Sequence, residues 1–377
     1  MTVSLPTSGP TRDVAVDAAP VTTVTRRVVD QAVLQRVRRT RTTGRARAVV
    51  VSAGLAIACV VVFAVSLSVG SFAVPLREVL PALVGHGSAD ADFIVGTLRL
   101  PRALTGVLVG VLFGLSGAVF QSLARNPLAS PDIIGITAGS GAAAVLVIVA
   151  GGAFGWSAGS VSLPVAAFVG GLATTTAVYL LAYRRGLSAY RLVLVGIGIA
   201  AVMSSVTSFL LTRAEIDDVQ RATVWLTGSL NGRGWGEVVP LSVAAVVLVP
   251  AVLVLARPLR ALQLGDDTAR GVGLPVERTR AALIVVAVGC ASVATAAAGP
   301  VAFVAFVAAP IARRLVRAPS TIVPAALAGA LLVLASDLVA RTAFSPTELP
   351  VGIVTGLVGA PYLLWLLARA DRVGRTG

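Results

Sequence analysis

The chain has 377 residues, of which 56% are hydrophobic and only 13% are charged, with a formal net charge of +14. A soluble domain carries about 25% charged residues and cannot shield this much apolar surface from water. The composition therefore excludes a soluble enzyme, a disordered scaffold and a secreted disulfide-bonded module. All 31 basic residues are arginine. We expect them to follow the membrane topology, and we expect no nucleic-acid partner.

Residues 1–48 are polar and basic and lack the apolar core of a secretory signal peptide. We expect them to form a disordered cytoplasmic tail. Its arginines between Arg36 and Arg47 are expected to contact anionic membrane lipid.

Residues 49–370 predict a ten-span membrane domain, and residues 371–377 a cytoplasmic C-terminal tail. About 20 apolar residues are enough for one helical crossing of the bilayer. The predicted spans are 49–70, 103–121, 132–150, 161–182, 192–211, 238–256, 281–298, 301–316, 321–342 and 350–368. The expected fold class is an all-α polytopic membrane protein. Gly106, Gly110 and Gly114 lie on one helix face, as do Gly352 and Gly356, which favours close helix packing.

Arginine is distributed unequally between the two sides of the predicted membrane domain. With the N-terminus in the cytoplasm, that side also holds Arg125, Arg184, Arg185, Arg191, Arg257, Arg260, Arg270, Arg278, Arg280, Arg313, Arg314, Arg317, Arg369, Arg372 and Arg375. The opposite side holds Arg77, Arg99, Arg102, Arg213, Arg221 and Arg233, with Arg341 near a span end. By the positive-inside rule, both termini are expected in the cytoplasm, with the chain in a bacterial plasma membrane.

Residues that usually carry catalysis are scarce. A P-loop needs a lysine, and the chain has none, so it cannot bind ATP through a P-loop. If ATP powers transport, the nucleotide sites are expected on another polypeptide. His86 is the only histidine, and Cys59 and Cys290 both lie in apolar segments. The sequence therefore predicts no enzyme activity, no metal site and no cofactor bound by this chain.

The longest polar connection between spans runs from Arg257 to Arg280. Within it, Asp266, Asp267 and Thr268 favour the start of a short helix after Gly265, and Gly271 or Gly273 favours its end. Such a helix could dock a soluble partner or could be a solvated connector.

Six sequence blocks in the same order and spacing resemble the FecCD family, the permeases of ABC importers for ferric siderophores, cobalamin and haem. The blocks are Arg99–Arg102, Ser116–Gln121 with Arg125–Ala129, Trp225–Trp235, Gly265–Gly273, Gly299–Val304 and Glu348–Gly352. Within the family, Gly228–Gly232, Asp266–Ala269 and Val276–Arg278 are most similar to ferric enterobactin permease subunits.

The resemblance implies ten helices, a second permease subunit (an identical chain or a paralogue), two cytoplasmic ABC ATPases and an extracytoplasmic substrate-binding lipoprotein. It implies that ATP acts on the ATPases and that the cargo is an Fe(III)-siderophore. The segment matching the family's ATPase-coupling loop consists of Gly265, Asp266, Asp267, Thr268, Ala269, Arg270, Gly271 and Gly273.

Arg99, Arg102 and Arg341 match positions where the cobalamin permease meets its binding protein. Guanidinium groups suit bidentate pairing with carboxylates. Alternatively, Arg99 and Arg102 could anchor a helix start at the interface, and Arg341 could pair with Asp337 one turn earlier. Ser188, Ala189 and Tyr190 match the family's cytoplasmic gate, although Tyr190 is bulkier than usual.

Pro310 departs from the family pattern, because a histidine or glutamine usually occupies its position. A proline there moves any helix kink and removes a hydrogen-bonding side chain.

The expected function is therefore that of a permease subunit of an ABC importer for a ferric siderophore of the catecholate type, working by alternating access. Within the family, cobalamin or haem remains a second possible cargo. An ion-coupled secondary transporter is a possible function of another class, although it would bury carboxylates at mid-membrane, where Asp337 and Asp132 are the main candidates. A lipid-modifying enzyme would need a catalytic cluster, and none is found.

Overall fold

The computed structural model describes residues 31–70, 72–154, 162–183, 189–317, 321–344 and 347–374. The chain divides into two units, Met1–Thr43 and Gly44–Gly377. In the first unit, the described residues, 31–43, are helical. The tail boundary predicted after residue 48 lies inside a helix. The predicted disorder of residues 1–30 and the last three residues of the predicted C-terminal tail lie outside the described residues.

The described residues form helices joined by turns, and no strand occurs among them. In chain order the elements are α1 (Gln31–Ser68), α2 (Leu76–Leu83), α3 (Ala89–Phe93), a π-helical turn η1 (Ile94–Arg99), α4 (Leu100–Leu123), α5 (Ile136–Phe154), α6 (Ser162–Ala182), α7 (Ala189–Arg213), α8 (Ile216–Leu226), α9 (Trp235–Gln263), α10 (Asp266–Gly271), α11 (Val276–Ala298), α12 (Val304–Val316), α13 (Ile322–Thr342) and α14 (Val351–Gly374). The predicted all-α class is confirmed.

Seven helical segments of the described chain are long and apolar enough to cross a membrane. They are Thr42–Ser68, Ala89–Leu123, Leu163–Ala182, Tyr190–Arg213, Trp235–Gln263, Val276–Ala298 and Ile322–Thr342. The apolar parts of α5 and α14, Ile136–Gly151 and Val351–Leu366, are shorter, and α12 has 13 residues. A helix overlaps each of the ten predicted spans, but the number of crossings stays a prediction.

α4 is the central helix of the second unit and packs against α9, α11, α12 and α13. Every residue from Leu112 to Gln121 is buried. A Cβ atom on Gly110 would lie 2.4 Å from the Gly329 carbonyl oxygen, and one on Gly114 would lie 2.4 Å from the Ala325 carbonyl oxygen. The close packing predicted from these two glycines is confirmed, and it brings α4 backbone to backbone with α13. The same prediction is confirmed for Gly352, whose Cβ atom would lie 1.9 Å from the Thr227 carbonyl oxygen, but Gly356 has no atom of the described chain within 4 Å of its Cβ position.

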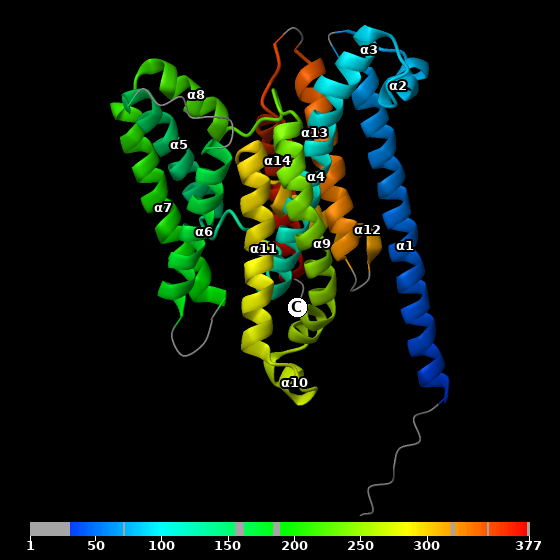
Figure 1. Ribbon diagram of the computed structural model, residues 1–377. Coiled ribbons are helices and arrows are strands. Elements are labelled where there is room, and N and C mark those ends of the chain that lie inside the picture. The colour runs from blue at the N-terminus through cyan, green and yellow to red at the C-terminus, as the bar shows by residue number, and fades with distance from the viewer. Residues whose placement is uncertain are drawn as a thin grey trace, which may run out of the picture. The chain divides into compact units, whose positions relative to one another are not determined.

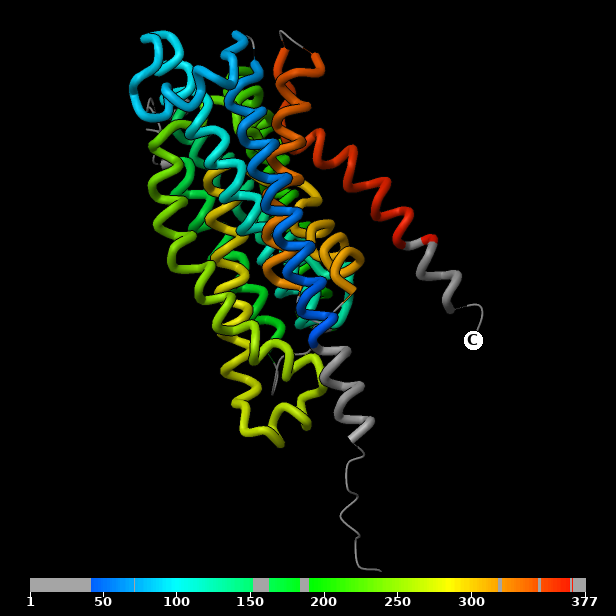
Figure 2. The backbone as a smooth tube through the Cα atoms, turned by 90° about the vertical axis from the view of Figure 1, so that its right-hand side faces the viewer, coloured from blue at the N-terminus to red at the C-terminus, as the bar shows by residue number. Residues whose placement is uncertain are grey.

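The other helices of the second unit surround this core. α5, α6 and α7 pack on one another, and α5 and α6 also contact α11 (Figure 1). Figure 2 shows the apolar part of α14 diverging from the bundle toward its C-terminal end. α10 lies at one end of the bundle, hereafter the α10 end, whereas α2, α3 and α8 lie at the opposite end, hereafter the α8 end (Figure 1).

Candidate functional site

α10 occupies the polar connection between α9 and α11, with the boundaries that its sequence predicts. Gly265 precedes the helix with φ of +119°, and Gly273 follows it with φ of +81°. Both values lie in the region that favours glycine, so these residues allow the chain to turn sharply on either side of six helical residues. The predicted short helix is confirmed, whereas its role as a coupling loop stays a prediction.

One buried residue and ion pairs with α11 attach α10 to the bundle. Ala269 is fully buried, and Asp266 accepts hydrogen bonds at 2.9 Å on both carboxylate oxygens from Nη2 of Arg280 in α11. Arg270 lies 3.3 Å from Asp267 and 3.7 Å from Glu277, and all three of these side chains are more than half exposed. Sequence reasoning assigned Arg280 to the cytoplasmic side but gave it no role. Its partner is 14 residues away, beyond helical spacing, so sequence periodicity carried no signal for the pair.

Two apolar side chains stand exposed beside α10. Leu264 is 73% exposed and Val272 is 72% exposed, and they flank the helix at its start and end. Together with exposed Asp267, Thr268 and Arg270, they give α10 a mixed polar and apolar surface. Such a surface is suited to contact with a protein. Sequence reasoning identified the polar residues of the loop and missed these two.

At the α8 end, Arg99 is bound by the chain itself. Its guanidinium donates to the carbonyls of Leu67 at 2.8 Å and Ser68 at 2.9 Å, and also to the carbonyl of Phe72. Leu67 and Ser68 end α1, so Arg99 binds carbonyls that the helix end leaves without partners inside the helix. The Ser68 carbonyl also accepts from the backbone N–H of Val74 at 3.1 Å. The side chain comes from η1, the π-helical turn immediately before α4.

Arg102 and Arg341 converge on one buried carboxylate. Arg102 donates from Nη2 to Asp337 at 2.9 Å and from Nη1 to Glu348 at 2.8 Å, whereas Arg341 Nε lies 3.9 Å from Asp337. Arg341 instead donates to the Ser66 carbonyl at 2.5 Å and hydroxyl at 2.7 Å. The intrahelical pair expected from helical spacing is therefore the weaker of the two contacts to Asp337.

These three arginines also line a cavity of about 460 Å³ at the α8 end, with Asn231, Arg233 and Glu348 among its other residues. Four guanidinium groups, including that of Arg233, line the cavity, and three carboxylates pair with them: Asp337, Glu348 and Glu237. This leaves one excess positive charge at the cavity. An anionic group would be attracted there, although the guanidinium groups of Arg99, Arg102 and Arg341 already donate hydrogen bonds within the chain. Docking through Arg99, Arg102 and Arg341 stays a prediction.

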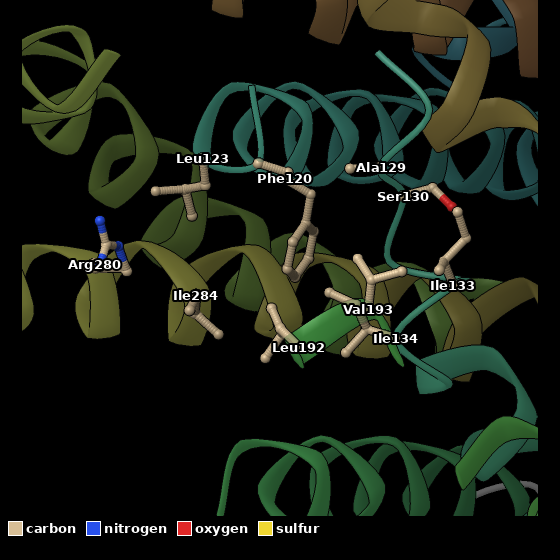
Figure 3. Close-up of a pocket in the computed structure, with 11 residues that line it drawn as sticks. Phe120, Leu123, Ala129, Ser130, Ile133, Ile134, Leu192, Val193, Arg280 and Ile284 are labelled. Carbon is tan, nitrogen blue, oxygen red and sulfur yellow. The ribbon is translucent and has the colours of Figure 1, made fainter. Parts of the chain in front are cut away.

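Of the predicted gate residues, Ser188 lies outside the described residues. Ala189 begins α7, and Tyr190 is 76% exposed. Shortly after them, Leu192 and Val193 of α7 line a cavity of about 80 Å³. Phe120 and Leu123 of α4 and Arg280 and Ile284 of α11 lie on its other sides (Figure 3).

Gln121 of α4 explains how α12 accommodates Pro310. A proline has no backbone N–H, so Pro310 leaves the carbonyl of Phe306, four residues earlier, without its helical donor. Gln121 donates from Nε2 to this carbonyl at 2.9 Å, and its own side-chain oxygen accepts from Arg313. A neighbouring helix thus supplies the donor that the backbone of Pro310 lacks, whereas the predicted effect of the missing histidine or glutamine side chain stays a prediction.

Among the described residues, no group of three or more histidine, cysteine, aspartate and glutamate side chains is placed to hold a metal ion. The arrangement is that of a membrane protein with a packed helical core, a short helix with a mixed exposed surface at one end and a charged cavity at the other.

The chain belongs to the FecCD transport family, whose model matches residues 32–369. The predicted family is confirmed. The chain is 40% identical over 316 residues to the ferric enterobactin transport system permease protein FepG of Escherichia coli K12, with 84% of this chain and 94% of that protein covered. It is 42% identical to the achromobactin transport system permease protein CbrC of Dickeya dadantii, covering 82% of this chain and 88% of that protein.

Among solved structures, a putative metal-chelate type ABC transporter in an inward-facing conformation matches with a TM-score of 0.73 and 27% identity. The match covers 85% of this chain and 99% of that one.

Proposed function

We propose that this chain is the permease subunit of an ABC importer that takes up a ferric siderophore of the catecholate type. The observation that carries the cargo assignment is the 40% identity to the ferric enterobactin permease across 94% of its length. The achromobactin permease and the metal-chelate transporter favour the same broader class, a chelated metal ion.

In this proposal the chain crosses the membrane ten times and has both termini in the cytoplasm. Arg257, Arg260, Arg270 and Arg278 cluster beside α10 in the sequence, which favours a cytoplasmic α10 end. The second permease subunit would be a paralogue or an identical chain.

Transport would be driven by two separate ATPases that bind ATP. α10 would contact them through Asp267, Thr268 and Arg270 together with Leu264 and Val272. Movement of α10 would then change the permease between outward and inward openings, with residues 188–190 at the cytoplasmic gate.

The binding lipoprotein would dock at the α8 end. The excess positive charge of the cavity, which lies beside Arg102 and the partly exposed Glu348, would attract and orient an acidic surface of the lipoprotein. Arg99 and Arg341 would support this surface by fixing the end of α1, because their guanidinium groups hold its last carbonyls.

An ion-coupled transporter needs a carboxylate that is free to bind and release its ion. Asp337 does not fit this role, because Arg102 binds it on both oxygens. Asp132, the other candidate, lies in the turn before α5 and not within a helix. Cobalamin and haem, the alternative cargoes named from the sequence, are distinguished from a ferric siderophore by direct uptake measurements.

The test is uptake of radiolabelled iron by cells with and without the gene, supplied as ferric catecholate, ferric hydroxamate or haem, with labelled cobalamin in parallel. The proposal predicts that deletion abolishes catecholate uptake alone and that the wild-type gene restores it. Loss of another cargo would replace the catecholate assignment. Unchanged uptake of every cargo, in a strain without a second system, would contradict the proposal.

A further inference from the structure

α10 cannot be stable without the bundle. It has six residues, and isolated helices of fewer than about 12 residues are marginal in water. Burial of Ala269 supplies one attachment, and the Asp266–Arg280 pair supplies the other. The remaining pairs around Arg270 are exposed, and pairs of that kind contribute little. The position of α10 therefore depends on Arg280 more than on any other charged side chain described near it.

Arg280 also faces a second element. Its side chain is 19% exposed, and it lines the cavity of about 80 Å³ that lies between α4, α7 and α11. Figure 3 shows the guanidinium group at one end of this lining, beyond Leu123 and Ile284, with Leu192 and Val193 of α7 further along. The head of one side chain thus binds α10, while the same side chain borders a space shared with the start of α7.

We propose that Arg280 is a positioning residue that links α10 to the start of α7. A displacement of α10 pulls on a guanidinium group bound to both oxygens of Asp266, and therefore on the first turns of α11. Leu192 of α7 packs against the hydrophobic cluster that contains Phe120 and Ile284, so a shift of these close-packed residues reaches the start of α7. The consequence for transport rests on the proposed function, because it assumes that α10 receives the ATPase.

The link itself is tested on the full chain in lipid nanodiscs, by hydrogen–deuterium exchange in Arg280→Gln and Asp266→Asn. Each variant is expected to exchange about fivefold faster both over α10 and over residues 189–195, as expected for loss of a partly buried ion pair in which one guanidinium nitrogen contacts both carboxylate oxygens. Arg278→Gln is the matched control, because Arg278 is an exposed residue on the same helix and the substitution removes the same charge. Faster exchange of α10 alone, or no change in either segment, would overturn the proposal.

Two further substitutions, combined in one variant, test whether faster exchange comes from loss of the proposed link between α10 and α7 or from a general loss of structure. The charge-exchanged pair Asp266→Arg with Arg280→Asp is made in a Glu277→Gln background, because Glu277 lies 3.9 Å from Arg280 and would repel an aspartate there. It is expected to return exchange in both segments toward the level of Glu277→Gln alone, which a purely local packing defect would not do. Failure of this rescue in a folded variant would also contradict the link.

In the reconstituted importer, Arg280→Gln is expected to keep ATP hydrolysis but to transport about tenfold less cargo per ATP than Arg278→Gln. If the wild-type importer transports no ferric siderophore, the proposed function is wrong. The hydrogen–deuterium exchange measurements would still show whether Arg280 links α10 to the start of α7.

Discussion

Asp337 accepts hydrogen bonds from Nη2 and Nε of Arg102 at 2.9 and 3.1 Å and thereby ties the first turn of α4 to the last turns of α13. The Asp337 side chain is 3% exposed. The pair lies at one end of the contact between α4 and α13. Further along the two helices, Gly110 and Gly329 allow their backbones to touch.

Removing Arg102 alone leaves Asp337 buried with Arg341 as its remaining charged neighbour, 3.9 Å away. We expect Arg102→Gln to destabilise the folded protein by about 3–5 kcal/mol, because it removes the hydrogen-bonded partner of a buried carboxylate. Arg102→Gln with Asp337→Asn is expected to cost less than Arg102→Gln alone. Thermal unfolding in detergent checks this, with Arg77→Gln, whose side chain is 84% exposed, as the control. A double variant less stable than the single one would contradict this role of the pair.

Gln121 and Pro310 are expected to be energetically coupled. Gln121→Leu leaves the buried Phe306 carbonyl without a donor and is expected to cost about 1–3 kcal/mol of unfolding free energy. Pro310→Ala restores the backbone N–H that can reach this carbonyl, so Gln121→Leu should cost less in that background. The measurement is a double-mutant cycle of unfolding free energies. Strictly additive costs would show that the two residues do not share the carbonyl.

Gly110→Ala is expected to push α4 and α13 apart, because its Cβ atom would lie 2.4 Å from the Gly329 carbonyl oxygen. We expect a loss of about 1–3 kcal/mol from overpacking. Gly356→Ala is the matched control: nothing lies within 4 Å of its Cβ position, so the alanine should be neutral or stabilise its helix. Equal thermal stabilities of the two variants would refute this packing argument.

Arg314 holds α14 against the end of α12 through two aromatic rings. Its guanidinium carbon lies 3.8 Å from the ring centre of Trp365 and 5.6 Å from that of Tyr362. Arg314→Gln is expected to speed hydrogen exchange over residues 358–366 by about fivefold, since a cation–π contact is worth roughly 0.5–2 kcal/mol. Arg317→Gln, also at the end of α12, should leave that segment unchanged. A variant Arg314→Gln with wild-type exchange would contradict this role.

The all-helical class and the helix positions could be predicted from sequence because apolar segments of about 20 residues carry a strong local signal. α10 could also be predicted from local signals, because Gly265 and Asp266 favour the start of a helix and Gly273 favours its end. The glycine face of α4 could also be predicted to pack closely, because small residues at four-residue spacing allow the backbones of two membrane helices to approach each other.

The charged contacts could not be predicted from the sequence, because they join residues that are far apart in the chain. Helical spacing placed Asp337 beside Arg341, whereas its principal partner, Arg102, is 235 residues away. Likewise, Pro310 suggested a lost hydrogen bond, but only the fold brings Gln121 to the freed carbonyl. Leu264 and Val272 escaped notice because their exposure depends on how α10 sits beyond the ends of α9 and α11.

The most direct test of the central claim measures ATP-dependent cargo uptake into proteoliposomes that contain this chain with its partner permease, ATPases and binding protein. The wild-type importer is compared with one in which residues 265–273 carry the same amino acids in scrambled order. We predict ATP-dependent uptake of the ferric siderophore by the wild type and its loss in the scrambled variant, with the permease still folded. Uptake that continues without ATP, or that survives the scrambling, would contradict the claim that this chain is the permease of an ATP-driven importer coupled through α10.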